Sequence, residues 1–145
     1  SSHERLAGFR QGLADFDLSL DDALLHEGGY TFDSGVACAE KLLALPPAMR
    51  PTAVFCGNDE MAIGAYQAAR RAGYDVPGDL SIVGYDDTPI ASRIWPPLTT
   101  VRLPIRDMGK AAAELLIARR GEGAESTLIA FTPEIVERQS TAPPK

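Results

Sequence analysis

Polar side chains follow two apolar runs at equivalent points of this sequence, and they offer the best binding chemistry of the chain. Asn58 and Asp59 come directly after the first run, and Asp86 and Asp87 come directly after the second. An asparagine amide both donates and accepts hydrogen bonds, whereas a carboxylate offers acceptor oxygens. This set suits a polyhydroxylated or heterocyclic small molecule. The alternative for both pairs is structural, since Asn and Asp also cap helices and form turns.

The two apolar runs predict strands, and the segment between them predicts a helix. Residues 53–57 and 80–84 are short and apolar, as in strands that are buried on both faces, and residues 59–72 carry mostly small apolar side chains. Gly73 then favours a helix end, because glycine readily adopts the left-handed conformation found there. A strand–helix–strand unit of this length makes the two strands parallel. Their polar ends therefore share the carboxyl edge of the sheet, where α/β proteins bind ligands.

The rest of the chain alternates helix and strand patterns in the same way. We expect Tyr30, which follows a short strand, to lie on the same edge and to offer a flat aromatic face. The expected elements are a helix from Ser1 or Ser2 that reaches Phe16, a strand at 23–26, a helix begun by Asp33 or Ser34 and ended at 45–47, a strand at 98–103, a helix at 105–120, and strands at 127–131 and 134–138. This order predicts an α/β fold with a mainly parallel sheet.

Length and composition indicate one globular domain that does not itself bind nucleic acid. The 145 residues are 45% hydrophobic and carry a net charge of −6. No cluster of Lys and Arg exceeds a pair such as Arg70–Arg71, so the chain lacks a basic surface for a phosphate backbone. No apolar run reaches the length of a membrane span. Cys38 and Cys56 are too few for a disulfide framework, and we expect two reduced core thiols in a cytosolic protein.

The sequence contains none of the common catalytic or metal-binding patterns. It has no GxxxxGK[ST] phosphate loop and no GxGxxG, GxSxG or HExxH motif, and His3 and His26 belong to no metal-spaced cluster. His26 could reach the ligand edge, although a histidine at a strand end is more often just a polar side chain. Asp86 and Asp87 are neighbours in an extended segment and point to opposite sides, so they make a poor acid–base couple. We therefore expect a binding protein without metal or cofactor, and no enzyme.

Five stretches of the sequence resemble one family of transcription regulators. They are ERLAGF at 4–9, GGYTFDSG at 28–35, residues 50–87, residues 96–116 and VERQST at 136–141, in family order and with family spacing. The chain resembles the C-terminal part of LacI/GalR-type transcriptional repressors. The resemblance implies a periplasmic-binding-protein-like fold with three α/β/α layers, which holds a sugar or nucleobase effector in a cleft. It also implies a cytoplasmic homodimer that binds operator DNA through an N-terminal helix-turn-helix outside this chain.

The resemblance also assigns effector-binding roles to individual residues. Arg5 matches the family arginine that hydrogen-bonds the effector, and its five donors suit ring oxygens, hydroxyls or a carboxylate. Tyr30 matches an aromatic residue that stacks on the effector, and Asn58 and Asp86 match the polar contacts at the two strand ends. Trp95 lies near the cleft by its position, where it could form a wall or simply pack.

The resemblance divides the chain into three parts. Residues 1–103 form the C-terminal effector-binding subdomain, residues 104–126 hold a crossover helix that belongs to the N-terminal subdomain in the family, and residues 127–145 form the returning strands and tail. Leu103 departs from the family, since many members carry a glutamine there and an apolar side chain cannot replace its hydrogen bond. The apolar stripe of the crossover helix would face water, so we expect it to pack against another copy of the chain or to stay mobile.

Two other functions remain as alternatives. A periplasmic sugar-binding protein of a transporter would share the fold, but the PPLTTVR and VERQST segments resemble the repressor branch. A small α/β hydrolase using Asp86 or Asp87 would need a nucleophile and a base, and the sequence offers no such set.

Overall fold

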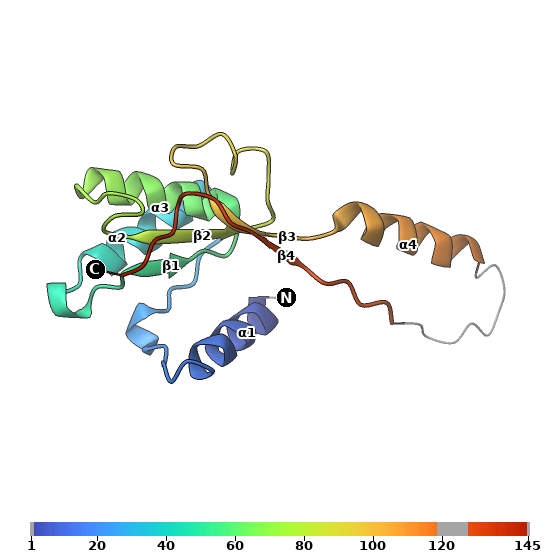
Figure 1. The fold of residues 1–145 in the computed structure, drawn as a ribbon, viewed down its shortest axis with the longest axis horizontal. Helices are drawn as coiled ribbons and strands as arrows, with labels where there is room; N and C mark the ends of the chain where they lie inside the picture. Colours follow the sequence, from blue (N-terminus) through green and yellow to red (C-terminus); the bar gives the residue numbers. More distant parts are fainter. Residues whose placement is uncertain (1, 119–127, 145) are drawn as a thin grey trace.

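A four-stranded sheet forms the centre of the computed structural model, which describes residues 2–118 and 128–144 (Figure 1). The strands lie in the order β1-β2-β3-β4; the first three run parallel, and β4 runs antiparallel to β3. The parallel pairing predicted from the two apolar runs is therefore confirmed. The strands are β1 (Ala53–Phe55), β2 (Ser81–Tyr85), β3 (Thr99–Arg102) and β4 (Glu134–Val136).

Helices lie on both faces of this sheet, which confirms the three-layer α/β/α fold class. α2 and α3 lie side by side on one face (Figure 1). α1 lies on the other face, where Phe9 stacks on Phe55 with the ring centroids 5.5 Å apart. The helices are α1 (Ser2–Ala14), α2 (Phe32–Leu43), α3 (Asp59–Arg71) and α4 (Ile105–Ala118), and two 3-10 turns span Asp22–Leu24 and Pro47–Met49.

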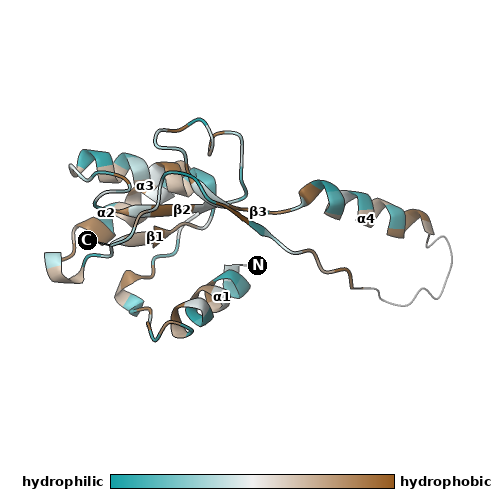
Figure 2. Ribbon diagram, viewed as in Figure 1, coloured by the Kyte–Doolittle hydropathy of each residue, from teal (hydrophilic) through white to brown (hydrophobic). Residues whose placement is uncertain are grey.

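The hydrophobic core lies between the sheet and the pair α2–α3. Leu80, Ile82 and Leu98 are fully buried there, against a row of small side chains on α3. Figure 2 shows the apolar strand β2 enclosed between α3 and β1. Gly64 lets α2 and α3 approach closely, because a Cβ at this position would lie 2.3 Å from the carbonyl oxygen of Phe32. The close approach of these two helices therefore depends on a missing side chain.

The ends of α3 lie where the sequence predicts them, whereas α2 starts earlier than predicted. Asn58 caps α3, and Gly73 after its end has a φ of +79°, so both predictions are confirmed. α2 is capped instead by Thr31, whose hydroxyl accepts from the Ser34 amide at 3.2 Å while the Ser34 hydroxyl accepts from the Thr31 amide at 3.2 Å. The prediction that Asp33 or Ser34 begins this helix is therefore wrong by two to three positions.

Two predicted strands are missing from the described sheet. The run 23–26 does not form a strand, because Asp21 accepts a hydrogen bond from the Ala23 amide at 2.9 Å and starts a 3-10 turn that takes up half of the run. Residues 128–131 are also not a strand, while position 127 lies outside the described residues. Both predictions were wrong, since a short apolar run does not by itself supply a pairing partner.

The segment around Ser140 returns to the central strand β2. The Ile82 amide donates to the Ser140 carbonyl at 2.8 Å, and the Ser140 hydroxyl donates to the Ile82 carbonyl at 2.5 Å. The same hydroxyl accepts from the Thr99 amide at 2.8 Å. Ser140 is fully buried, so it occupies the space beside β2 just before β3 begins.

The helix α4 projects away from this body on the arm made by β3 and β4 (Figure 1). None of its side chains is buried, and Ile105, Met108 and Leu116 are exposed. The predicted helix 105–120 is confirmed as far as Ala118, and its last two positions lie outside the described residues. No described helix combines the length and apolar character that a membrane span requires. The three-part division of the chain stays a prediction.

The contact at Gly64 predicts the outcome of a matched pair of substitutions. Gly8, on α1, would place a Cβ in open space, so Gly8→Ala should stabilise the protein by about 0.5–1 kcal/mol through helix propensity alone. Gly64→Ala should instead destabilise it by about 1–3 kcal/mol, because its Cβ would meet backbone atoms of α2 that cannot move aside. Urea unfolding of both variants measures the difference. Equal stabilisation by both substitutions would contradict the close packing of α2 on α3.

Candidate ligand-binding site

A buried carboxylate joins the three segments that form the carboxyl edge. Asp59, the first residue of α3, is fully buried, and its Oδ2 accepts from the Thr88 amide at 2.6 Å and the Thr88 hydroxyl at 2.9 Å. Its Oδ1 accepts from the Thr100 hydroxyl at 2.5 Å. Gly84 leaves room for this carboxylate, since a Cβ there would lie 2.3 Å from Asp59 Oδ1. Asp59 is therefore a structural residue. The side chains next to it at the edge, and not its own carboxylate, remain available to a ligand.

Asn58 positions the loop that carries Tyr30. Its Oδ1 accepts from the Met61 amide at 2.9 Å, and its Nδ2 donates to the Tyr30 carbonyl at 3.0 Å. Tyr30 has a φ of +59°, a left-handed conformation that is costly for a residue with a large side chain. The Asn58 bond helps to hold it there. One amide group thus starts α3 and fixes the aromatic residue at the same edge.

Arg5 reaches this edge from α1 and lies between two tyrosines. Its Nη1 donates to the Gly57 carbonyl, and its Nη2 donates to the Tyr30 hydroxyl at 3.2 Å. Its guanidinium carbon lies 4.5 Å from the ring centroid of Tyr85 and 5.5 Å from that of Tyr30, as in cation–π contacts. Tyr85 is not among the residues predicted for the site. Its position as the last residue of β2, directly before Asp86, was the available signal.

Asp86 presents a carboxylate that accepts no hydrogen bond from the described residues. Its backbone amide donates to the Val101 carbonyl at 2.8 Å, which fixes the residue at the end of β2. Burial and the charge of Asp59 raise the pKa of Asp86, and the positive charge of Arg5 offsets part of that rise. A carboxylate held without a donor near an arginine is available to a ligand that carries hydroxyl or N–H groups.

Asp87 takes a different role from its neighbour. Its carboxylate accepts from Arg102 Nε and from Arg138 Nη2, both at 2.6 Å. Burial alone would raise the pKa of Asp87, but the hydrogen bonds and charges of the two arginines outweigh it, and the pKa is lowered. Asp86 and Asp87 thus face different partners, which agrees with the expectation that they do not form an acid–base couple.

Trp95 is separate from the other predicted site residues in the described structure. Its side chain is 81% exposed, and no described contact joins it to Arg5, Tyr30, Asn58 or Asp86. The structure therefore brings four of the five predicted residues together and leaves the fifth on the loop that precedes β3.

A mostly apolar cavity of about 470 Å³ opens beside this edge, between α1 and the free edge of β1. Arg5 and Tyr30 contribute to its lining, together with apolar side chains such as Leu6 and Phe55. His26 also contributes, and its buried Nε2 has no hydrogen-bond partner among the described residues. The predicted contact of His26 with the ligand edge stays open, since it lies next to the cavity and not among the four gathered residues.

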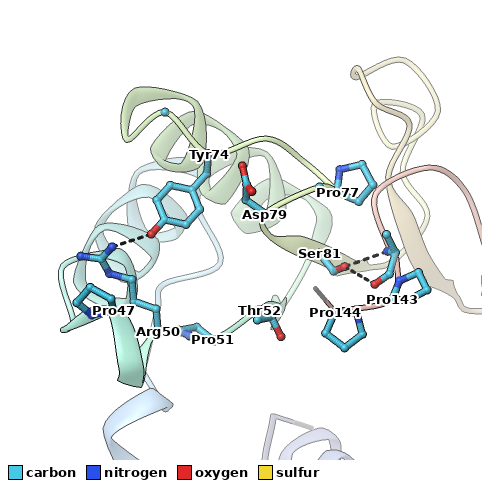
Figure 3. Close-up of a pocket in the computed structure, with 13 residues that line it drawn as sticks. Pro47, Arg50, Pro51, Thr52, Tyr74, Pro77, Asp79, Ser81, Pro143 and Pro144 are labelled. Carbon is cyan, nitrogen blue, oxygen red and sulfur yellow. Dashed lines mark hydrogen bonds between the residues drawn. The ribbon is translucent and has the colours of Figure 1, made fainter.

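A second cavity, of about 420 Å³, lies at the opposite, amino edge of the sheet (Figure 3). Arg50 and Tyr74 lie together on one side of it, and the arginine Nη1 donates to the tyrosine hydroxyl at 2.9 Å. Ser81 on its floor exchanges hydrogen bonds with the backbone of Ala142, at 3.0 and 3.2 Å. None of the predicted site residues lines this cavity.

The buried Cys56 thiol is unreactive, and the described part of the chain holds no candidate metal site. Cys38 and Cys56 are free thiols, and burial raises the pKa of Cys56 to about 12, so this thiol stays protonated. Within residues 2–118 and 128–144, no three His, Cys, Asp or Glu side chains form a group that could hold a metal ion.

Comparison with known proteins identifies the family. The family model described as "Periplasmic binding protein-like domain" matches residues 1–141 of this chain. The chain is 40% identical over 138 residues to the HTH-type transcriptional repressor PurR of Vibrio cholerae, and 37% identical over 139 residues to Catabolite control protein A of Priestia megaterium. These alignments include 94% and 95% of this chain but only 40% and 41% of the two relatives, so the chain spans well under half of their length.

Solved structures agree with this relationship. A regulatory protein of the LacI family from Chloroflexus aggregans has a TM-score of 0.88 and 38% identity, over 97% of this chain and 50% of that one. The transcriptional regulator CelR in complex with cellobiose has a TM-score of 0.87 and 37% identity, over 94% of this chain and 42% of that one. The chain belongs to the periplasmic-binding-protein-like family, in its LacI-type branch of transcriptional regulators.

The raised pKa of Asp86 predicts a pH-dependent stability difference. The folded chain binds a proton at Asp86 more tightly than the unfolded chain does, so the ionised carboxylate lowers stability above its folded pKa. Asp86→Asn should therefore stabilise the protein at about pH 7, and the gain should vanish as the pH falls below the usual value of 3.8. Urea unfolding across this pH range tests the prediction, with the exposed Asp107→Asn as the control. A gain that stays constant with pH would contradict it.

Proposed function

We propose that this chain is the effector-binding part of a LacI-type transcriptional repressor and that a small molecule of the sugar or nucleobase type binds at its carboxyl edge. The observation that carries the proposal is the free carboxylate of Asp86 beside the fixed guanidinium of Arg5. An acceptor and a cluster of donors at one edge suit a ligand with several hydroxyl or ring N–H groups.

The remaining predicted residues complete this binding surface. Tyr30, held by Asn58, would offer a ring face for stacking, and the second proton on Asn58 Nδ2 is available to a ligand. Trp95 lies apart from these residues in the described structure, and its large exposed aromatic surface would suit a sugar ring. Among related structures, the CelR complex contains cellobiose, and a LacI family regulator from Lactobacillus casei, 33% identical with a TM-score of 0.81, contains sucrose. These ligands support an effector of the sugar class for this chain.

An enzymatic function has less support. The relatives are transcriptional regulators. The carboxylate of Asp87 already accepts hydrogen bonds from two arginines, so it is not free to act as an acid or base. Asp86 alone supplies neither a nucleophile with its base nor an acid–base pair. The transport alternative is also not favoured, because the relatives that match over 94% of the chain are repressors.

DNA binding and cellular location follow from the repressor function. With a net charge of −6, the chain has little attraction for a phosphate backbone, so operator DNA would be bound by another part of the protein. A repressor acts on DNA, and we therefore place the protein in the cytoplasm.

The exposed arm suggests that two copies associate. The side of α4 that carries Ile105, Met108, Ala112, Leu115 and Leu116 contains no buried residue. An apolar stripe of this kind is stabilised when a second surface covers it, at about 25 cal/mol per Å² of apolar area. We propose a homodimer in which α4 contacts the partner chain.

Replacing the Asp86 carboxylate tests the binding role. Native mass spectrometry of the purified full-length protein should first identify the retained effector. Asp86→Ala should then weaken its binding by about 1.5–3 kcal/mol, because a hydrogen bond to a charged group is lost. Isothermal titration calorimetry measures the affinity, and the exposed Asp107→Ala serves as the control. Unchanged affinity in a folded Asp86→Ala protein would contradict the proposed site.

The α4 stripe predicts a change of oligomeric state. Light scattering of this chain should show a dimer, and Leu115→Glu should shift it toward monomer, because a charge would enter the apolar contact. The same charge at exposed Ala113, outside the stripe, should leave the dimer intact. A monomer in the unmodified protein would contradict the proposed contact.

A further inference from the structure

One carboxylate ties together the end of β2 and both strands of the arm. Asp87 follows β2 by two positions and accepts from Arg102 Nε and Arg138 Nη2, each at 2.6 Å. Arg102 is the last residue of β3, which leads out to α4, and Arg138 lies two positions after β4, which brings the chain back. Figure 1 shows these two strands leaving the body side by side.

The cluster is partly shielded from water and has further fixed contacts. The side chains of Asp87 and Arg138 are 9% and 17% exposed, so their charges interact more strongly than a surface pair would. Arg138 Nη1 also donates to the Leu98 carbonyl at 2.7 Å, directly before β3 begins. Arg102 is half exposed and pairs in addition with Glu134 on β4 at 3.4 Å. The Arg138 contact is therefore the stronger of the two.

Asp86 and Asp87 are adjacent, and both have an uncommon backbone conformation. Their φ angles are +108° and +53°, so both are in the left-handed region, which is uncommon for residues other than glycine. Two adjacent residues hold such conformations only where the surroundings fix them. The contacts that fix this pair are the Asp86 amide bond to Val101 and the two arginine bonds of Asp87. Releasing Asp87 would therefore let the Asp86 carboxylate leave its position at the edge.

We propose that Asp87 is a positioning residue, which locks the outgoing and returning strands to the end of β2 and thereby holds Asp86 ready for the effector. A ligand that hydrogen-bonds to the Asp86 carboxylate therefore also changes the orientation of β3 and β4. The position of α4, which these strands carry, changes with them. The importance of Asp86 rests on the proposed function, whereas the lock between Asp87, Arg102 and Arg138 stands on the contacts alone.

The lock is tested by hydrogen exchange and by carboxyl NMR on Asp87→Asn, with the exposed Asp107→Asn as the matched control. Asn keeps the shape but lacks the charge, so protection of the β3 and β4 amides should fall about tenfold, the usual scale for losing a charge-assisted bond. The pKa of Asp86 measured by NMR should also shift in Asp87→Asn and stay unchanged in the control. Arg138→Lys keeps the charge and should give an intermediate loss of protection.

The pH dependence separates this role from a general packing role. Asp87 has a lowered pKa, so its stabilisation is present above the usual carboxyl pKa and is lost as the pH falls through the lowered value. The charged groups facing it are Arg102, Arg138 and, through Arg102, Glu134, with Asp86 beside it. Protection of the arm amides should therefore fall at low pH in the wild type and be low at every pH in Asp87→Asn.

Two results would overturn the proposal. Unchanged protection of β3 and β4 in Asp87→Asn would show that the lock does not hold the arm, and an unchanged pKa of Asp86 would show that it does not position the ligand group. Neither readout needs an effector. Their failure is therefore distinct from a failure of the proposed function, which Asp86→Ala binding reports.

Discussion

The buried carboxylate of Asp59 is the interaction on which the carboxyl edge depends. A charge removed from water is costly unless donors surround it, and Asp59 finds them in Thr88 and Thr100. These donors come from the loop after β2 and from β3, while Asp59 itself begins α3. Satisfying one carboxylate therefore brings three separate segments to the same point. Arg5, Tyr85 and Asp86 can be arranged around that point only because it is fixed.

Each pair of adjacent polar residues combines one enclosed side chain with one that keeps hydrogen-bonding groups free. Asp59 is enclosed, while Asn58 beside it faces the Tyr30 loop and keeps part of its amide free. Asp87 is enclosed by two arginines, while Asp86 keeps a carboxylate without a donor in the described structure. The groups proposed to meet a ligand are thus joined by one peptide bond to groups that hold the fold. Rigid support at this distance limits the reorganisation that binding would otherwise require.

Local patterns in the sequence predicted the parallel unit, the cap at Asn58 and the glycine after α3, because each depends on a few neighbouring residues. They did not predict the partners of Asp59 and Asp87, which lie 15 to 51 positions away and meet only in the folded chain. The run 23–26 was misread as a strand, since the turn begun by Asp21 decided the local conformation. The resemblance to a family assigned Arg5 a role that its helix position alone did not indicate.

The bonds of Ser140 have a consequence for how the chain folds as it is made. The central strand β2 is complete only when Ile82 pairs with Ser140, 58 positions later in the chain. Until the ribosome has released that segment, β2 and the start of β3 keep unpaired backbone groups that are buried in the finished protein. Such distant contacts slow folding, since a long loop must close before they form. The sheet therefore closes only after the segment around Ser140 has been made, and a change at Ser140 would affect the centre of the sheet and not merely its rim.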